Sequence, residues 1–256
     1  MPTRSSFEVL EFDLSAALLR ELTALFNDMK STVLTKSSIQ RIDDAQGVYQ
    51  LLYANRLVYI GKTDAEAGLK KRLARHASKI EHRRILEAKQ VSFKAVRVYV
   101  FTPMDLEQQL IKYYRSGGTA LDWNLSGFGS NDFGRQRDTT KLKAQHFDLK
   151  YPVNIDIPIE VPGVARISFV ADILAHLKDK LPYTLRYQNA GGRSRKPHPD
   201  LASSTLSITK SPDTVRSILQ QIKCALGAPW QITLQPGYVI LYREIKESYP
   251  HGIVIK

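Results

Sequence analysis

Two short runs rich in Val, Ile, Leu and Tyr stand out in the middle of the chain, at residues 47–53 and 57–60. A short break at residues 54–56 separates them. Two such runs around a short break are typical of a tight β-hairpin. We therefore predict a hairpin that brings tyrosines of both strands, Tyr49 and Tyr59, near one another.

Apolar residues recur at helical spacing on both sides of this hairpin. Residues 14–31 predict an amphipathic helix that packs on the core or on a second subunit. Residues 63–90 predict another helix, whose start Gly68 could delay. Arg72 and His76 lie at the edge of its apolar stripe and inside it, one turn apart. A polar pair in an apolar stripe breaks the pattern, and such breaks indicate function. The alternatives are that Arg72 extends its charged end to the surface and that His76 is a core histidine whose hydrogen bonds are satisfied.

A strand at residues 91–101 follows. Thr102 then caps a helix that has Pro103 at its first position and Asp105 in its first turn, and that ends near Arg115. Glu107 falls within the apolar stripe of that helix. A carboxylate there is costly unless it is paired or binds a cation, so it is either a metal ligand or the partner of an arginine.

Residues 116–140 form a glycine-rich, polar loop, and Trp123 and Phe128 indicate that it is ordered. Its best candidates for phosphate or base contacts are Asn124, Arg135 and Arg137.

The remaining chain, residues 151–256, alternates strand-like and helix-like segments. We predict an α+β protein in three parts. The first is an N-terminal helical extension (1–46), and the second is a small antiparallel sheet flanked by helices (47–150). The third is an added C-terminal α+β domain (151–256), an ordinary domain size, in which we find no catalytic constellation.

The charge of the chain indicates what kind of partner it binds. The formal net charge is +12, and residues 47–150 hold 19 Lys and Arg against 10 Asp and Glu. A basic patch of this kind favours a nucleic-acid backbone, although solubility alone is an alternative. A single cysteine, Cys224, excludes an internal disulfide and a cysteine-based zinc cage. No signal-like or membrane-spanning apolar run is present, so we expect a cytoplasmic location without a membrane partner.

Six positions in order resemble the GIY-YIG endonuclease family. The first triplet is Gly47-Val48-Tyr49, with Val for the usual Ile, and the second is Tyr59-Ile60-Gly61. The family's helix arginine and, in some branches, a histidine four residues on match Arg72 and His76. Its metal-binding glutamate and later asparagine match Glu107 and Asn124. Residues 127–138 also look like the type II restriction-enzyme branch, whose members cut short palindromic, GC-rich DNA sites as homodimers.

The resemblance implies a GIY-YIG nuclease core that hydrolyses double-stranded DNA with one Mg²⁺ (or Mn²⁺) held by Glu107. Arg72 would grip the scissile phosphate, and Tyr59 would orient water or phosphate. Either Tyr49 or His76 would activate the water, and Asn124 would hold a phosphate oxygen or position a side chain. Further DNA contacts are expected at Lys62, Arg75, Arg135 and Arg137. The alternatives are a structure-specific repair or mobile-element nuclease of the same family and a DNA-binding module without catalysis.

Overall fold

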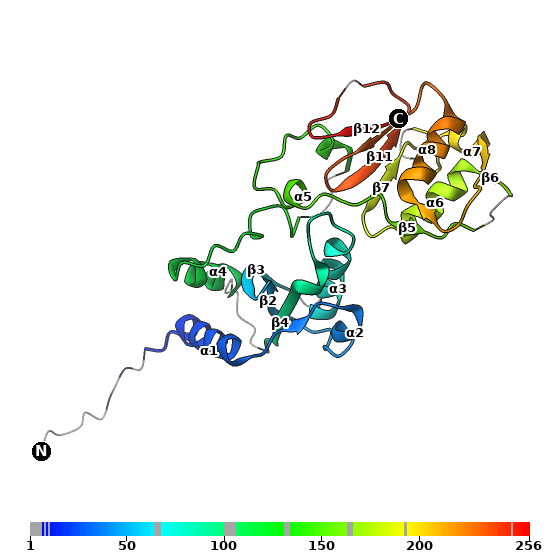
Figure 1. Cartoon of the computed structure of the whole chain (residues 1–256). Coiled ribbons are helices and arrows are strands. Elements are labelled where there is room, and N and C mark those ends of the chain that lie inside the picture. Colours follow the sequence, from blue (N-terminus) through cyan, green and yellow to red (C-terminus); the bar gives the residue numbers. More distant parts are fainter. Residues whose placement is uncertain are drawn as a thin grey trace, which may run out of the picture. The chain divides into compact units, whose positions relative to one another are not determined.

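The computed structural model describes residues 7, 9, 11–63, 68–99, 106–130, 134–162, 166–191, 194–246 and 248–256. The chain divides into two compact units. Unit 1 comprises Met1–Ala74 and Lys89–Asp122, and unit 2 comprises Arg75–Ala88 and Trp123–Lys256. Each unit is described by itself (Figure 1).

Unit 1 is built on an antiparallel sheet, which among the described residues has four strands in the order β1-β4-β2-β3. The strands are β1 (Thr32–Val33), β2 (Gly47–Tyr53), β3 (Arg56–Lys62) and β4 (Val91–Arg97). The predicted hairpin is confirmed as β2 and β3. Its two-residue turn places Ala54 and Asn55 at φ 47° and 63°, which matches the twist of the flanking strands.

Helices cover this sheet. They are α1 (Leu14–Asp28), α2 (Lys36–Ile39), α3 (Leu69–Ile80, which continues into unit 2) and α4 (Leu106–Ser116), with the short turn η1 at Ala88–Gln90. Leu22 and Phe26 of α1 and Leu110 of α4 share one core with Val48 and Ile60 of the sheet. The predicted first helix therefore packs on the core, and it lies beside α4 (Figure 1).

The helix predicted for residues 63–90 is wrong at its C-terminal end. α3 begins at Leu69, directly after Gly68, and ends at Ile80. His82 and Ile85 adopt φ values of 55° and 66°, and an α-helix cannot continue through left-handed residues. The predicted cap of the next helix, at residues 102–105, lies outside the described residues.

Unit 2 holds a second sheet, with the described strands in the order β12-β10-β11-β7. β11 pairs with β10 antiparallel and with β7 parallel. The strands of unit 2 are β5 (Pro158–Ile159), β6 (Ile167–Phe169), β7 (Thr184–Tyr187), β8 (Thr205–Ser207), β9 (Asp213–Thr214), β10 (Gln231–Leu234), β11 (Tyr238–Tyr242) and β12 (Ile253–Ile255). The helices are α5 (Phe147–Lys150), α6 (Val170–Lys180), α7 (Pro199–Ser203) and α8 (Val215–Leu226), with the 3₁₀ turn η2 at Gly134–Arg137.

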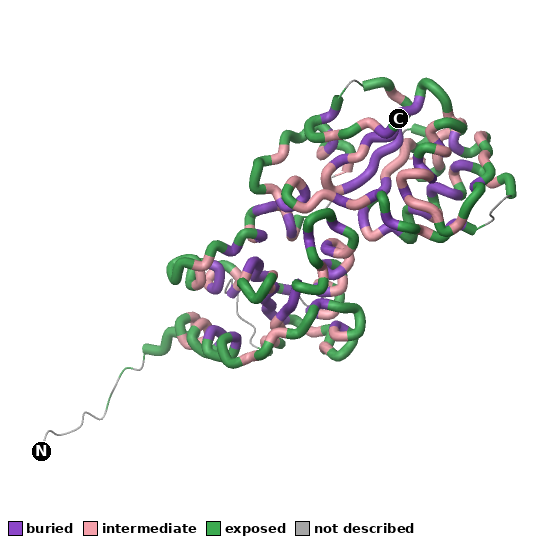
Figure 2. Tube along the Cα trace, viewed as in Figure 1, coloured by how far each residue is buried: buried purple, intermediate pink, exposed green. Residues whose placement is uncertain are grey.

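The two faces of this sheet have different partners. Leu174 of α6 and Leu219 of α8 pack with Val239 in the main core, where buried residues follow β11 and its neighbours (Figure 2). Tyr238 and Tyr242 alternate to the other face and form a separate buried cluster.

The glycine-rich loop packs against that second face of the sheet. Asp138, which is 1% exposed, accepts hydrogen bonds from Arg186 and from the Tyr242 hydroxyl. Residues 123–150 therefore group with unit 2, whereas the sequence placed a boundary near residue 150. The chain is a mixed α+β protein with small, mainly antiparallel sheets, which confirms the coarse fold prediction. Among the described helices, none is both long and apolar enough to cross a membrane.

Candidate functional site

Tyr49 and Tyr59 lie on one face of the β2–β3 hairpin. Tyr49 pairs with Gly61, and Tyr59 pairs with Leu51, so the two phenol rings are diagonal neighbours on the same side of the sheet. Their ring centroids are 6.1 Å apart, and both side chains are buried. The hairpin thus brings the predicted tyrosines together.

Gly61 leaves room for this pair. A Cβ atom at Gly61 would lie 2.4 Å from the Tyr49 hydroxyl oxygen and 2.8 Å from a ring carbon of Tyr59. No side chain fits there unless the phenols move. Close approach to the tyrosines, rather than an unusual φ, accounts for this glycine.

Arg72 reaches the tyrosines from α3. Its Nε donates a hydrogen bond of 3.4 Å to the Tyr49 hydroxyl. The start of α3 is fixed by the loop before the hairpin, because Asp44 accepts from the Lys71 amide at 3.4 Å and the Ala45 carbonyl accepts from Leu69. No sequence pattern indicates this role of Asp44, because it depends on a contact between residues 27 positions apart.

Thr63 is a second residue that the sequence analysis missed. Its hydroxyl accepts from the Gly47 amide at 2.9 Å, and the Gly47 carbonyl accepts from the Thr63 amide at 2.9 Å. These bonds hold the two ends of the hairpin together beside the tyrosines. Lys62 is exposed at the same end of β3.

The electrostatics of the cluster keep both phenols protonated. Burial raises the pKa of Tyr49, with a further contribution from Tyr59, and Arg72 lowers it only in part. The pKa of Tyr59 is also raised, first by burial, and the charge of Glu107 adds to this while Arg72 opposes it. Burial lowers the pKa of Arg72, but its hydrogen bonds to the two tyrosines outweigh burial and the net shift is upward. The guanidinium is charged and its phenol partners are neutral.

Glu107 joins this cluster from the first turn of α4, where it is half-buried and its charge acts on Tyr59. Within the described part of the chain, no three His, Cys, Asp or Glu side chains form a metal-binding group. A single carboxylate suits Mg²⁺, which keeps several waters and uses one or two carboxylates together with substrate phosphates. The residues present therefore fit the predicted Mg²⁺ only if Glu107 is the carboxylate ligand and water and substrate phosphates fill the other positions.

The other predicted site residues belong to unit 2. His76 is buried and stacks on Phe128, with ring centroids 4.7 Å apart and an interplanar angle of 15°. Arg75 is exposed on α3, and Asn124 is half-buried next to Trp123, which packs in the same aromatic cluster.

Arg135 and Arg137 also belong to unit 2, where both make contacts within the protein. Arg135 lies over the ring of Tyr242 at 4.1 Å and pairs with Glu244 at 3.4 Å. Arg137 pairs with the buried Asp148 at 2.7 Å. Part of their charge is therefore balanced by neighbouring carboxylates, and their contact with DNA stays a prediction.

In comparisons with known proteins, no protein-family model and no curated protein matches the chain.

Proposed function

We propose that the chain is a Mg²⁺-dependent endonuclease of the GIY-YIG type that hydrolyses phosphodiester bonds in double-stranded DNA. One observation carries the proposal: Tyr49, Tyr59, Arg72 and Glu107 gather in one unit, on two strands and two helices. These residues are far apart in the sequence. Because they lie together in the folded chain, they support the sequence resemblance with evidence that is independent of the motif match.

Arg72 is the residue that would bind the scissile phosphate. Its hydrogen-bond partners are neutral hydroxyls, so its positive charge is not neutralised by them. A planar guanidinium donates two parallel hydrogen bonds to a phosphate. Donors fixed in place before the reaction stabilise the charge that develops in the transition state.

The water that attacks phosphorus needs a base, and Tyr49 and His76 remain the two candidates. Burial raises the pKa of Tyr49, so this phenol keeps its proton at neutral pH unless further positive charge is added. In that state Tyr49 accepts the hydrogen bond from Arg72 and fixes the direction of the guanidinium. His76 has the side chain whose intrinsic pKa suits general-base catalysis.

Glu107 would hold the cation through one carboxylate, and the phenol of Tyr59 beside it would orient a water or a phosphate oxygen. A bound divalent cation supplies Lewis-acid stabilisation of the phosphoryl and leaving oxygens.

The proposed substrate follows from charge as well as from the cluster, since residues 47–150 are strongly basic. The finer proposal is a type II restriction enzyme that reads a short palindromic site as a homodimer, because a twofold dimer matches a twofold sequence. A cytoplasmic location is part of the same proposal.

The test replaces Glu107 in the full chain. We expect Glu107→Gln to abolish Mg²⁺-dependent cleavage of plasmid DNA while duplex binding persists, because the substitution removes the carboxylate charge and keeps the size of the side chain. Glu21→Gln, an exposed glutamate on α1, is the matched control and should cut normally. Normal cleavage by Glu107→Gln refutes the metal role, and binding without cleavage by the wild type identifies a DNA-binding module instead.

A further inference from the structure

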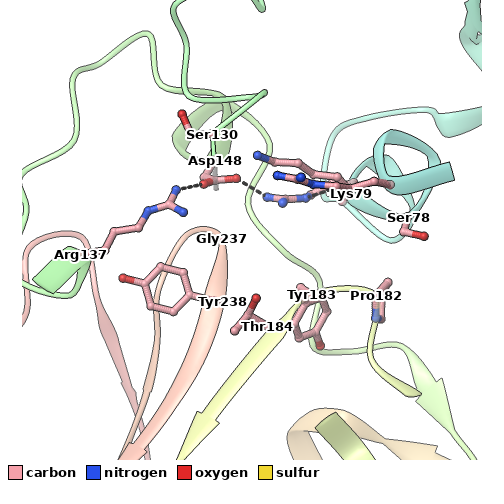
Figure 3. Close-up of a pocket in the computed structure, with 12 residues that line it drawn as sticks. Ser78, Lys79, Ser130, Arg137, Asp148, Pro182, Tyr183, Thr184, Gly237 and Tyr238 are labelled. Carbon is pink, nitrogen blue, oxygen red and sulfur yellow. Dashed lines mark hydrogen bonds and ion pairs between the residues drawn. The ribbon is translucent and has the colours of Figure 1, made fainter. Parts of the chain in front are cut away.

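Unit 2 contains a pocket of about 560 Å³ that the proposed nuclease chemistry does not use. Lys79 enters it from α3, Arg137 from η2 and Asp148 from α5, while Tyr183 and Tyr238 form the wall opposite (Figure 3). Five separate segments of the chain thus contribute polar or aromatic groups to one cavity.

Positive charge dominates this lining. Arg75, Lys79, Arg83 and Arg137 face a single carboxylate, Asp148, which gives a formal net charge of +3. Asp148 is 3% exposed, and it accepts from Arg83 at 2.9 Å and from Arg137 at 2.7 Å (Figure 3). Its charge is shared between two guanidiniums, so little remains for Lys79. Uncompensated charge at low dielectric is costly, and an anion in the pocket would relieve that cost.

Lys79 is the cation most in need of a partner. Its ammonium donates to the carbonyls of Phe128 at 2.6 Å and Gly127 at 3.1 Å. An ammonium has three donors, and in the described part of the chain the hydrogen bonds of Lys79 go to these two carbonyls, so a third donor is available to the pocket. Burial lowers the pKa of Lys79 to about 8, and the positive charges of Arg83, Arg137 and Arg75 lower it while Asp148 raises it.

The uncharged lining suits an oxyanion rather than an apolar ligand. Ser78, Ser130 and Thr184 bring hydroxyl groups to the cavity, and hydroxyls, like lysine and arginine, donate hydrogen bonds to phosphate oxygens. The turn at Gly237 approaches Asp148 so closely that a Cβ atom there would lie 2.6 Å from its carboxylate. The cavity therefore depends on a glycine at this position.

The basic surface continues beyond this pocket. Ser130 and Arg137 also line a neighbouring pocket of about 530 Å³, together with Lys141 and Lys143. Two adjoining cavities with basic linings can follow a chain of phosphates, because successive phosphates along a nucleic-acid strand repeat the same charge.

We propose that the pocket around Lys79 is a second phosphate site, which holds a backbone phosphate of the DNA substrate away from the scissile bond. Lys79 and Arg75 bind the phosphate, and Arg83, Asp148 and Arg137 fix the shape of the site. The phosphate chemistry follows from the pocket alone, whereas the assignment of the phosphate to DNA rests on the proposed function.

The experiment removes one charge at a time from the full chain. Lys79→Gln keeps a donor for the two carbonyls and loses the charge, and Arg75→Gln changes an exposed side chain and so tests the site without disturbing the interior. Lys180→Gln is the matched control, because it removes the same charge from unit 2 at an exposed residue outside the pocket. The probes are inorganic phosphate, followed by thermal unfolding at constant ionic strength, and a duplex oligonucleotide titrated over a range of salt.

We expect phosphate to raise the melting temperature of the wild type and of Lys180→Gln. Phosphate should bind both pocket variants about tenfold more weakly, because each variant loses one charge-assisted hydrogen bond. The salt dependence of duplex binding should become shallower by about one counterion in each pocket variant. Equal behaviour of pocket and control variants overturns the site. A pocket-dependent response to phosphate but not to duplex DNA overturns the assignment to the DNA backbone. Absent cleavage with both responses intact overturns the nuclease proposal and leaves the phosphate site standing.

Discussion

Arginines in the two units are held in opposite ways. In unit 1 Arg72 hydrogen bonds to the neutral phenols of Tyr49 and Tyr59, whereas in unit 2 Arg83 and Arg137 share the buried carboxylate of Asp148. Phenols orient a guanidinium without neutralising it. A carboxylate orients it and cancels most of its field at a distance.

The difference separates a group placed for a substrate from groups placed for structure. In the proposed function, Arg72 keeps its charge for an incoming phosphate. Asp148 offsets only part of the charge of Arg83 and Arg137, and Lys79 beside them adds to the positive charge of that pocket. The partner of a cation, rather than the cation itself, decides which of these roles it serves.

The largest expected effect is on Arg72. Arg72→Ala should slow the chemical step of duplex cleavage by a factor that corresponds to about 3–4 kcal/mol of lost transition-state stabilisation, as does the loss of one preorganised donor. Arg216→Ala is the comparison, because Arg216 pairs with the exposed carboxylate of Asp156 at 2.6 Å. Single-turnover rates at saturating protein measure both, and an unchanged rate for Arg72→Ala would remove Arg72 from the chemistry.

Asp148→Asn should act on folding instead of turnover. The substitution leaves Arg83 and Arg137 buried without their carboxylate, and a buried pair broken on one side costs about 3 kcal/mol or more. Urea unfolding should show a loss of that size. A stability within error of the wild type would mean that Asp148 is not needed to balance the two arginines.

A smaller effect is expected for Tyr49→Phe, which removes the acceptor of the Arg72 hydrogen bond and keeps the ring. A hydrogen bond to a charged group contributes about 1.5 kcal/mol to folding stability, so the unfolding free energy should fall by about that amount. The rate should fall about tenfold, because Arg72 is held less firmly in the direction that binds phosphate. A fall of about a thousandfold or more, together with loss of the pH dependence of the rate, would identify Tyr49 as the general base.

The smallest effect concerns Lys79 and pH. Burial lowers its pKa to about 8, below the value of about 10.4 in an unfolded chain. Between these values the unfolded state binds more protons, so the unfolding free energy rises with pH. The charged and titratable groups that face Lys79 are Asp148, Arg83, Arg137, Arg75 and His146.

Between about pH 8 and about pH 9, the unfolding free energy of the wild type should therefore rise by about 1 kcal/mol more than that of Lys79→Gln. Denaturant unfolding of both proteins at the two pH values measures this difference. A difference between the two proteins that does not change with pH would place the Lys79 pKa outside this window.

Local pattern was enough to predict the hairpin and the first helix. Alternation fixes which side chains share a face, so the neighbourhood of Tyr49 and Tyr59 follows from the register alone. Helical spacing likewise placed Arg72 at the edge of an apolar stripe, and the structure adds its contact with Tyr49.

Contacts between distant segments could not be predicted in this way. Lys79 falls on the polar flank of its helix by periodicity, yet the carbonyls of Gly127 and Phe128, 48 and 49 residues away, enclose its ammonium. The position of Arg137 in a polar loop predicts a contact with DNA, but in the structure Arg137 also forms an ion pair with the buried Asp148. A periodicity describes one element, whereas burial depends on what packs against it.

We propose above all that two phenols, a guanidinium and a carboxylate in unit 1 form a phosphodiester-cleaving centre. Its most direct test is incubation of the wild-type chain with plasmid DNA and Mg²⁺, followed by sequencing of the product ends. The account predicts discrete fragments whose ends share one short sequence. Plasmid that stays intact with Mg²⁺ and with Mn²⁺ would contradict it.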